Sequence, residues 1–337
     1  MKAVAYYQSL PSSDPESLQD IELPAPTPGP RDLLVQVRAI SVNPVDSKIR
    51  SNVAPTDGQA KVLGWDVAGV VQALGSEVSL FQVGDEVFYA GALQRQGGNS
   101  ELHVVDERIV GHKPRSLGFA EAAALPLTAI TAWELLFERL KIAEGSASHG
   151  QSLLIIGAAG GVGSILTQLA RQLTGLTVIG TASRPETADW VRQLGAHHVI
   201  DHSQPLLPQL QQLGISQVEH VASLTHTDQH YEQLIEALAP QGQLALIDDP
   251  AQLDVVKLKR KSLSLHWEFM YTRSLFETPD MQAQHALLEQ VAQLIDAGTL
   301  HTTLGEHFGS INANNLRRAH VLLESGKARG KIVLEGF

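Results

Sequence analysis

The sequence contains no cysteine among its 337 residues. Disulfide bonds, thiolate nucleophiles and zinc sites with cysteine ligands are therefore excluded. Positive charge is also scarce, because 25 lysines and arginines stand against 36 acidic residues, for a formal net charge of −11. A protein that binds nucleic acid over a broad surface needs basic residues to neutralise phosphates, so we expect no nucleic-acid partner.

Targeting segments and long apolar runs are missing as well. The first twenty residues, MKAVAYYQSLPSSDPESLQD, contain no apolar core of a secretory signal. We find no uninterrupted apolar run long enough to cross a bilayer, so we expect a cytoplasmic protein with no membrane partner. Apolar residues make up 43% of the chain and charged residues 18%. This composition is typical of a globular protein, and the length favours two domains.

The residue pattern changes twice along the chain. Residues 1–125 contain strand-like segments such as Asp32–Val42. Over 126–264, short apolar strands alternate with helices, which indicates an α/β domain whose doubly wound parallel sheet is covered on both faces. After 265 the alternation stops, and we infer that 265–337 return to the first, β-rich domain. The strands expected in the second domain are Leu153–Ile156, Thr177–Thr181, His198–Asp201, Val218–Leu224 and Gln243–Ile247.

A glycine-rich turn, AAGGVG (158–163), lies between the first of these strands and an amphipathic helix. Ala158 takes the place of the usual first glycine of a dinucleotide-binding turn. Gly160 allows the backbone to approach a pyrophosphate, and Gly163 allows the helix to pack closely on the strand. Because the first N–H groups of a helix bind phosphate, the pattern predicts a dinucleotide site. A purely structural turn is the alternative.

The residues after the second strand favour NADPH over NADH. An NAD site usually carries a carboxylate about 20 residues beyond the glycines, where it holds the ribose 2′-hydroxyl. This chain has Ser183 and Arg184 in that region and no carboxylate before Glu186. Arg184 is suited to pair with a 2′-phosphate with the Ser183 hydroxyl assisting, and a solvated loop arginine is the alternative.

Further motifs accompany the turn along the whole chain: SVNPVD (41–46), LPLTAITAW (125–133), LAPQGQLALID (238–248) and ESGKARGKIVL (324–334). Together they resemble the medium-chain dehydrogenase/reductase superfamily, in particular its zinc-free quinone oxidoreductase branch. The resemblance implies a GroES-like catalytic domain made from both chain ends, a central Rossmann domain and a homodimer.

The resemblance also implies two residues with a catalytic role, Asn43 near the nicotinamide ribose or the substrate and Thr128 near the carboxamide. A turn residue before Pro44 is the alternative for Asn43. Asp46 is expected to orient this loop or to cap the turn. With the glycine pattern added, the coenzyme contacts are expected at Asn43, Thr128, Ala158, Gly160, Gly161, Val162, Gly163, Ser183, Arg184 and Ile247.

The positions that hold catalytic zinc in related alcohol dehydrogenases differ in this chain. Those enzymes use a cysteine in the SVNPVD region, a histidine after a glycine, and a cysteine in the LPLTAITAW region. Asn43, Trp65 and Thr128 stand there instead, and these residue types do not form a zinc site, so we expect no metal. His226 and His230, which share one face of an expected helix, are a weaker metal alternative without a third ligand.

Reduction without a metal requires an acceptor that is already electrophilic, held close to the coenzyme. We therefore expect hydride transfer from NADPH to a quinone or a conjugated carbonyl. The alternatives are an enal or enone double-bond reductase with little quinone activity and a non-catalytic NADPH-binding protein of the same fold. Trp65, Tyr89 and Trp267 are candidate walls of an acceptor pocket, with core packing as the alternative.

Overall fold

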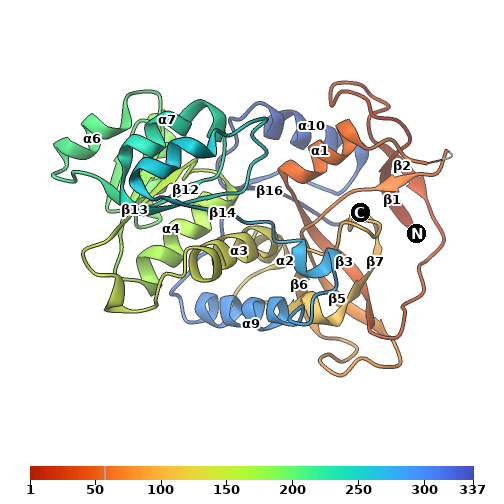
Figure 1. Cartoon of the computed structure of the whole chain (residues 1–337). Coiled ribbons are helices and arrows are strands. Elements are labelled where there is room, and N and C mark those ends of the chain that lie inside the picture. The colour runs from red at the N-terminus through yellow and green to blue at the C-terminus, as the bar shows by residue number, and fades with distance from the viewer. Residues whose placement is uncertain (57) are drawn as a thin grey trace. The chain divides into compact units, whose positions relative to one another are not determined.

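The computed structural model describes residues 1–56 and 58–337. The chain forms two compact units. Unit 1 comprises Met1–Ile130 and Tyr271–Phe337, and unit 2 comprises Thr131–Met270. The N-terminus and the C-terminus both belong to unit 1 (Figure 1). The residue pattern placed the two changes a few residues earlier, at 126 and 265.

Unit 1 is rich in β-structure. Its larger sheet has the strand order β15-β16-β3-β5-β6-β8, with β7 also paired to β3. The strand β16 pairs antiparallel with β3, which places Ile332 opposite Val42 and joins the two segments of the unit. A smaller sheet has the order β2-β1-β4. The strands are β1 Lys2–Tyr6, β2 Gln19–Glu22, β3 Asp32–Val42, β4 Lys61–Val62, β5 Val67–Leu74, β6 Glu86–Tyr89, β7 Leu102–Asp106, β8 Val110–His112, β15 Leu304–His307 and β16 Lys331–Glu335.

Helices of unit 1 pack on these sheets. α2 contacts β3, β5 and β16, and α9 contacts β8. α1 begins directly after β3 at Pro44, a residue whose fixed φ suits the first turn of a helix. The helices are α1 Pro44–Asn52, α2 Phe119–Ala123, α8 Thr272–Leu275, α9 Ala283–Asp296 and α10 Ala313–Glu324, and α3 Pro126–Trp133 spans the boundary between the units.

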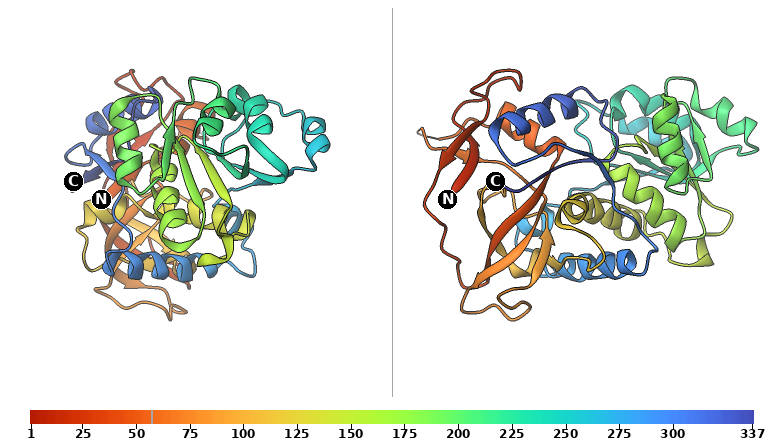
Figure 2. Two further views of the ribbon diagram at one scale, coloured as in Figure 1. Left: turned by 90° about the vertical axis from the view of Figure 1, so that its left-hand side faces the viewer. Right: turned by 180° about the vertical axis from the view of Figure 1, so that it is seen from behind.

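Unit 2 is built on a six-stranded parallel sheet with the order β11-β10-β9-β12-β13-β14. The chain winds outward from β9 through β10 to β11 and then returns to β12, so the winding direction reverses between β9 and β12. Because such crossovers are right-handed, this reversal places helices on both faces of the sheet. Figure 2 shows the helices of unit 2 on either side of its strands. The strands are β9 Ser152–Ile156, β10 Thr177–Thr181, β11 His198–Ile200, β12 Val218–Ser223, β13 Leu238–Leu246 and β14 Ser264–Trp267.

The five strands expected in this part of the chain are confirmed, with two differences. β13 begins at Leu238, because a bulge allows it to pair with β12 from Val218 onward. Residues 265–270, which the pattern assigned to the first domain, belong to unit 2, where β14 forms the sixth strand beside β13. The alternation is obscured here because a 3₁₀ segment, Val255–Lys261, precedes β14 in place of an α-helix.

The strands of unit 2 are apolar because they lie in its core. Every residue of β9 is buried, as expected for a parallel strand that is covered on both faces. The α4 side chains Ile165, Leu166 and Leu169 are fully buried, so the amphipathic face predicted for this helix packs inward. The helices are α4 Gly161–Leu173, α5 Pro185–Gln193, α6 Leu206–Gln212 and α7 Thr227–Ala237, preceded by a π-helical segment Glu134–Arg139.

One helical stretch of the described residues, Phe119–Arg139, is long and apolar enough to cross a membrane by length and composition alone. Of its most apolar window, 83% is buried inside the protein. The stretch is therefore a core element, as in many proteins that never enter a membrane.

Candidate coenzyme site

The glycine-rich turn follows β9 at the point where the winding of the sheet reverses. Gly157 leaves the strand with φ at +79°, a conformation that L side chains rarely adopt. Its N–H donates to Thr181 Oγ1 at 3.2 Å, which links the turn to the end of β10. Gly160 is the N-cap of α4, and its N–H donates to the Gly157 carbonyl at 3.1 Å. The turn therefore ends directly at a helix N-terminus, where N–H groups lack intrahelical partners.

Two glycines of the turn differ in the space around them. A Cβ at position 163 would lie 2.4 Å from the Gly157 carbonyl oxygen and 2.6 Å from Ala158 Cα. Helix α4 and the turn thus approach so closely that position 163 requires glycine. A Cβ at Gly160 would meet that same oxygen only at 3.4 Å. Packing alone therefore does not require glycine at 160, unlike at 163.

The other residues of unit 2 that are expected at the coenzyme lie at the same end of the parallel strands. Ser183 and Arg184 follow β10, and Ile247 follows β13. Because β9, β10 and β13 belong to one parallel sheet, their carboxyl ends lie at one edge, where such folds bind ligands. Unit 2 therefore collects its predicted residues at this edge: Ala158, Gly160, Gly161, Val162, Gly163, Ser183, Arg184 and Ile247.

The Arg184 guanidinium has a carboxylate close by. Arg184 is the N-cap of α5, and its Nη1 lies 3.4 Å from Glu186 Oε1. Ser183 is exposed beside it. A phosphate brought to this position would meet a cation and a hydroxyl, but it would compete with Glu186 for the cation.

Asn43 and Thr128 belong to unit 1, and hydrogen bonds within that unit hold both side chains. Asn43 Nδ2 donates to Asp66 Oδ2 at 2.9 Å and to the Trp65 carbonyl at 3.2 Å. Thr128 Oγ1 donates to the Leu125 carbonyl at 3.1 Å. The two residues are linked, because Asp66 Oδ1 accepts the backbone N–H of Leu127, next to Thr128, at 2.7 Å.

Asp46 caps the helix that follows Asn43. Its Oδ2 accepts the Asn43 N–H at 2.7 Å, and its Oδ1 accepts the Gly64 N–H at 2.9 Å. Burial raises the pKa of Asp46 to about 7, although both N–H groups favour the charged form. The capping alternative is thus what the structure shows, and the cap also fixes the loop that contains Gly64.

Two charged residues of this cluster were missed in the sequence, Asp66 and Lys331. The Lys331 ammonium donates to Asp66 Oδ2 and to the Val42 carbonyl, each at 2.9 Å, and to Asn43 Oδ1. Burial raises the pKa of Asp66, and the Lys331 ammonium opposes that rise. The available signal was a lone charge in each of two apolar stretches, GWDVAGVV and GKIVL, since such charges are buried in pairs.

Two of the three aromatic candidates pack in the core of unit 1. Trp65 and Tyr89 are fully buried. Tyr89 Oη is hydrogen-bonded to His103 Nδ1 at 2.9 Å, and Trp65 Nε1 donates to the Ala92 carbonyl at 3.4 Å. Trp267 differs, because it lies on the edge strand β14 and is 51% exposed.

The histidine alternative has no metal-binding geometry in the described part of the chain. His226 is hydrogen-bonded to its neighbour Thr225, and His230 stacks edge-on against His202 with ring centroids 5.9 Å apart. Across residues 1–56 and 58–337, no group of three or more histidine, cysteine, aspartate or glutamate side chains is arranged to hold a metal ion.

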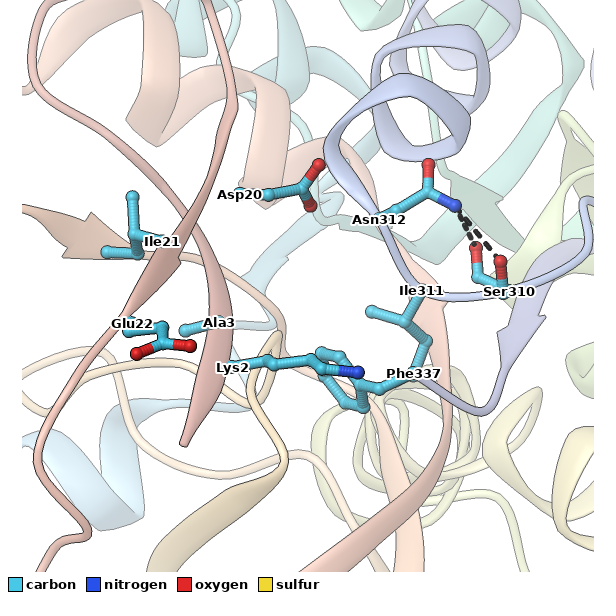
Figure 3. A pocket seen from close by; sticks show the side chains of 9 residues that line it. All are labelled: Lys2, Ala3, Asp20, Ile21, Glu22, Ser310, Ile311, Asn312 and Phe337. Carbon is cyan, nitrogen blue, oxygen red and sulfur yellow. Dashed lines mark hydrogen bonds between the residues drawn. The ribbon is translucent and has the colours of Figure 1, made fainter.

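Unit 1 also has a surface cavity of about 420 Å³ near the chain termini (Figure 3). Lys2 and Phe337 lie on one side of it, with Asn312, which donates to Ser310, on another. A second cavity, of about 640 Å³, lies beside Arg38 and Glu335. Neither cavity includes a residue predicted to contact the coenzyme.

Comparisons with known proteins agree with this architecture. The family described as "Alcohol dehydrogenase GroES-like domain" matches residues 29–133, and the family described as "Zinc-binding dehydrogenase" matches residues 194–334. A "Zinc-type alcohol dehydrogenase-like protein" of Staphylococcus aureus (strain MSSA476) is 40% identical over 336 residues, 99% of each chain. A "Quinone oxidoreductase" of Pseudomonas aeruginosa is 33% identical over 95% of this chain and 96% of its own.

The solved structures show the same fold. A provisionally named zinc-dependent alcohol dehydrogenase protein of Rhizobium etli CFN 42 superposes with a TM-score of 0.96 at 55% identity, covering 100% of this chain and 98% of that one. A GroES-like unit joined to a six-stranded Rossmann sheet is the architecture of a nucleotide-dependent oxidoreductase, and the expected fold class is confirmed. The chain belongs to the medium-chain dehydrogenase/reductase superfamily of NAD(P)-dependent oxidoreductases.

Several of these names refer to zinc, but the side chains present in unit 1 do not fit that ion. Zinc is held by thiolates, imidazoles and carboxylates, whereas an amide, an indole and a hydroxyl occupy the three expected ligand positions, Asn43, Trp65 and Thr128. Two carboxylates lie beside these positions, and both are already engaged. Asp66 accepts the Lys331 ammonium and two N–H groups, and Asp46 accepts the N–H groups of Asn43 and Gly64. A lysine cation thus takes the place at Asp66 that a metal would need.

Proposed function

We propose that this protein transfers a hydride from NADPH to an electrophilic small molecule, a quinone or a conjugated carbonyl, without a metal ion. One observation carries the proposal. A glycine turn precedes α4 at the carboxyl edge of the sheet, and the adjacent strand β10 is followed by Ser183 and Arg184 in place of a carboxylate. The name of the Pseudomonas relative supports a quinone as the acceptor.

The residues of unit 2 bind and orient the coenzyme. The N–H groups at the start of α4 hold the pyrophosphate, with Gly160 providing close approach. Arg184 would hold the 2′-phosphate in competition with Glu186, since a guanidinium is suited to pair with a phosphate. When bound, NADPH supplies the hydride from its reduced nicotinamide. In unit 1, we assign Asn43 to the nicotinamide ribose or substrate and Thr128 to the carboxamide.

The residues assigned to the site determine which hydride acceptor the protein can reduce. Oxidation of an ordinary alcohol needs a Lewis acid or a strong base to form the alkoxide. A quinone or an enone takes up hydride without such activation, and water delivers the proton that completes the reduction. Positioning of the two reactants is then the main contribution of the protein, which reaches about 7–11 kcal/mol in favourable systems.

The location and assembly of the protein are part of the proposal. We propose a cytoplasmic homodimer that has neither nucleic acid nor a membrane as a partner. The edge strand β14 supports a second copy, because it lies at the end of the sheet with Trp267 half-exposed, and an open edge favours pairing with another chain.

The coenzyme part of the proposal is tested by titration of NADPH and NADH. Arg184→Ala should weaken NADPH about tenfold more than NADH, because a hydrogen bond to a charged group is worth roughly 1.5–3 kcal/mol. Arg192→Ala is the matched control, since Arg192 lies on the same helix and pairs with Asp189 at 2.7 Å. Equal weakening of both coenzymes by Arg184→Ala would reject its 2′-phosphate role.

The acceptor part is tested by NADPH oxidation with a simple quinone and then with an enone. Faster turnover with the quinone supports the proposal, and turnover with the enone alone would make the protein a double-bond reductase. Tight NADPH binding without oxidation by either acceptor would make it a non-catalytic binding protein.

A further inference from the structure

Lys331 places a fully buried ammonium group between segments of unit 1 that are far apart in the sequence. Its side chain is 3% exposed, and its partner Asp66 is 0% exposed. Nζ donates to the Val42 carbonyl and to Asp66 Oδ2, each at 2.9 Å, and to Asn43 Oδ1. All three ammonium hydrogens therefore have partners, which lie at the carboxyl end of β3 and directly before β5.

Asn43 is held from both ends of its amide group. Oδ1 accepts the Lys331 ammonium, while Nδ2 donates to Asp66 Oδ2. Such an arrangement fixes which end of the amide is oxygen, because only the oxygen accepts from an ammonium. Asp66 in turn accepts the Leu127 N–H at the first turn of α3. The same cluster thus anchors the backbone next to Thr128.

The chemistry of this cluster requires a compact cation. An ammonium is a point charge with three donors, whereas a guanidinium is a planar fork that is too wide for three partners around one nitrogen. A buried carboxylate without a cation would be strongly unfavourable, so Lys331 and Asp66 depend on each other. The cluster is consequently rigid, and its geometry is set within unit 1.

We propose that Lys331 is a positioning residue of the hydride-transfer site, an internal cation that orients Asn43 and anchors the segment carrying Thr128 where related enzymes use a metal ion. This inference rests on the proposed function, since it concerns the two residues assigned to the nicotinamide and substrate. Lys331 thus affects turnover and does not contact the coenzyme phosphates.

The test compares Lys331→Met with Lys113→Met in the full-length protein. Lys113 is a matched control, because it is also buried in unit 1 and donates to the Pro114 and Leu117 carbonyls and to Glu86. Both variants should unfold at lower urea concentration than wild type. Only Lys331→Met should lower kcat with the quinone, by about 10- to 100-fold. Its NADPH Kd should rise by a smaller factor than kcat falls, because the phosphate contacts of unit 2 are intact. Equal kcat for the two variants would overturn the proposal.

A double variant keeps the test decisive if Lys331→Met does not fold. Lys331→Met combined with Asp66→Asn removes the uncompensated carboxylate, so it should regain much of the lost resistance to urea. Its kcat should remain low, because the Asn43 oxygen still lacks its ammonium partner. Recovery of wild-type kcat in the double variant would show a structural role alone.

Hydrogen exchange separates this inference from the proposed function. The Leu127 amide should exchange at least tenfold faster in Lys331→Met than in wild type, and it should be unchanged in Lys113→Met. If wild type reduces neither acceptor, the proposed reaction fails, and the exchange rate still decides whether Lys331 anchors this segment. An unchanged rate at Leu127 in Lys331→Met would overturn the positioning role whatever the activity.

Discussion

Replacing Gly163 by alanine tests the close approach of α4 to the turn. The added Cβ would lie 2.4 Å from the Gly157 carbonyl oxygen and 2.6 Å from Ala158 Cα. Ordinary contacts begin near 3.4 Å, so helix and turn would have to separate by almost 1 Å. Both atoms belong to the backbone, and Gly157 already has a positive φ. The collision therefore has no flexible side chain to absorb it.

The size of the effect follows from two opposing contributions. Overpacking of this kind costs about 1–3 kcal/mol, whereas alanine in place of glycine inside a helix gains about 0.5–1 kcal/mol. We expect Gly163→Ala to lower the free energy of unfolding by about 1–2 kcal/mol, or the Tm of unit 2 by roughly 3–8 °C. Calorimetry and urea unfolding followed by circular dichroism measure both quantities.

Gly160→Ala is the matched control for this prediction. Its Cβ meets nothing closer than 3.4 Å, so its stability should fall by no more than about 0.5 kcal/mol, the effect of a poorer N-cap. It should nevertheless weaken NADPH binding, because the methyl group occupies the phosphate approach. The reasoning about the turn is refuted if Gly163→Ala is as stable as wild type, or if Gly160→Ala is the less stable variant.

Three further predictions concern charge and metal. Burial and the neighbouring Glu134 raise the pKa of Glu268, so folding favours its neutral form. The stability of wild type relative to Glu268→Gln should therefore fall as the pH rises from 5 to 8. A difference in urea unfolding between the two proteins that stays constant with pH contradicts this. Glu186→Gln removes the carboxylate that lies 3.4 Å from Arg184. It should tighten NADPH about two- to fivefold without changing NADH, whereas equal tightening of both argues against competition. Dialysis against EDTA should leave NADPH oxidation by a quinone unchanged, and a loss that zinc restores would contradict the metal-free proposal.

The sequence could predict those features whose pattern is formed by consecutive residues. The turn at 158–163 was found because a strand, small residues and an amphipathic helix follow one another there. The coenzyme residues predicted in unit 2 follow β9, β10 and β13, whose carboxyl ends share one edge because the strands are parallel. β14 was assigned to the wrong unit, because a four-residue strand after a 3₁₀ segment leaves no helical period to detect.

The Lys331–Asp66 pair shows why other features could not be found. Its members are 265 residues apart in the sequence, and no local period connects them. Trp65 and Tyr89 were ambiguous for a related reason, because an aromatic side chain in a strand has the same pattern whether it packs in the core or lines a pocket. Only the three-dimensional packing distinguishes the two.

The pairing of β16 with β3 has a consequence for biosynthesis. Lys331 meets the Val42 carbonyl across 289 positions of sequence, so a ribosome must translate past residue 331 before this sheet is complete. Unit 2, which is one uninterrupted stretch, is free to fold co-translationally while unit 1 is still incomplete. A premature stop codon just upstream of 331 would then yield a polypeptide with a formed nucleotide module and an unfinished neighbour exposing the bare edge of β3.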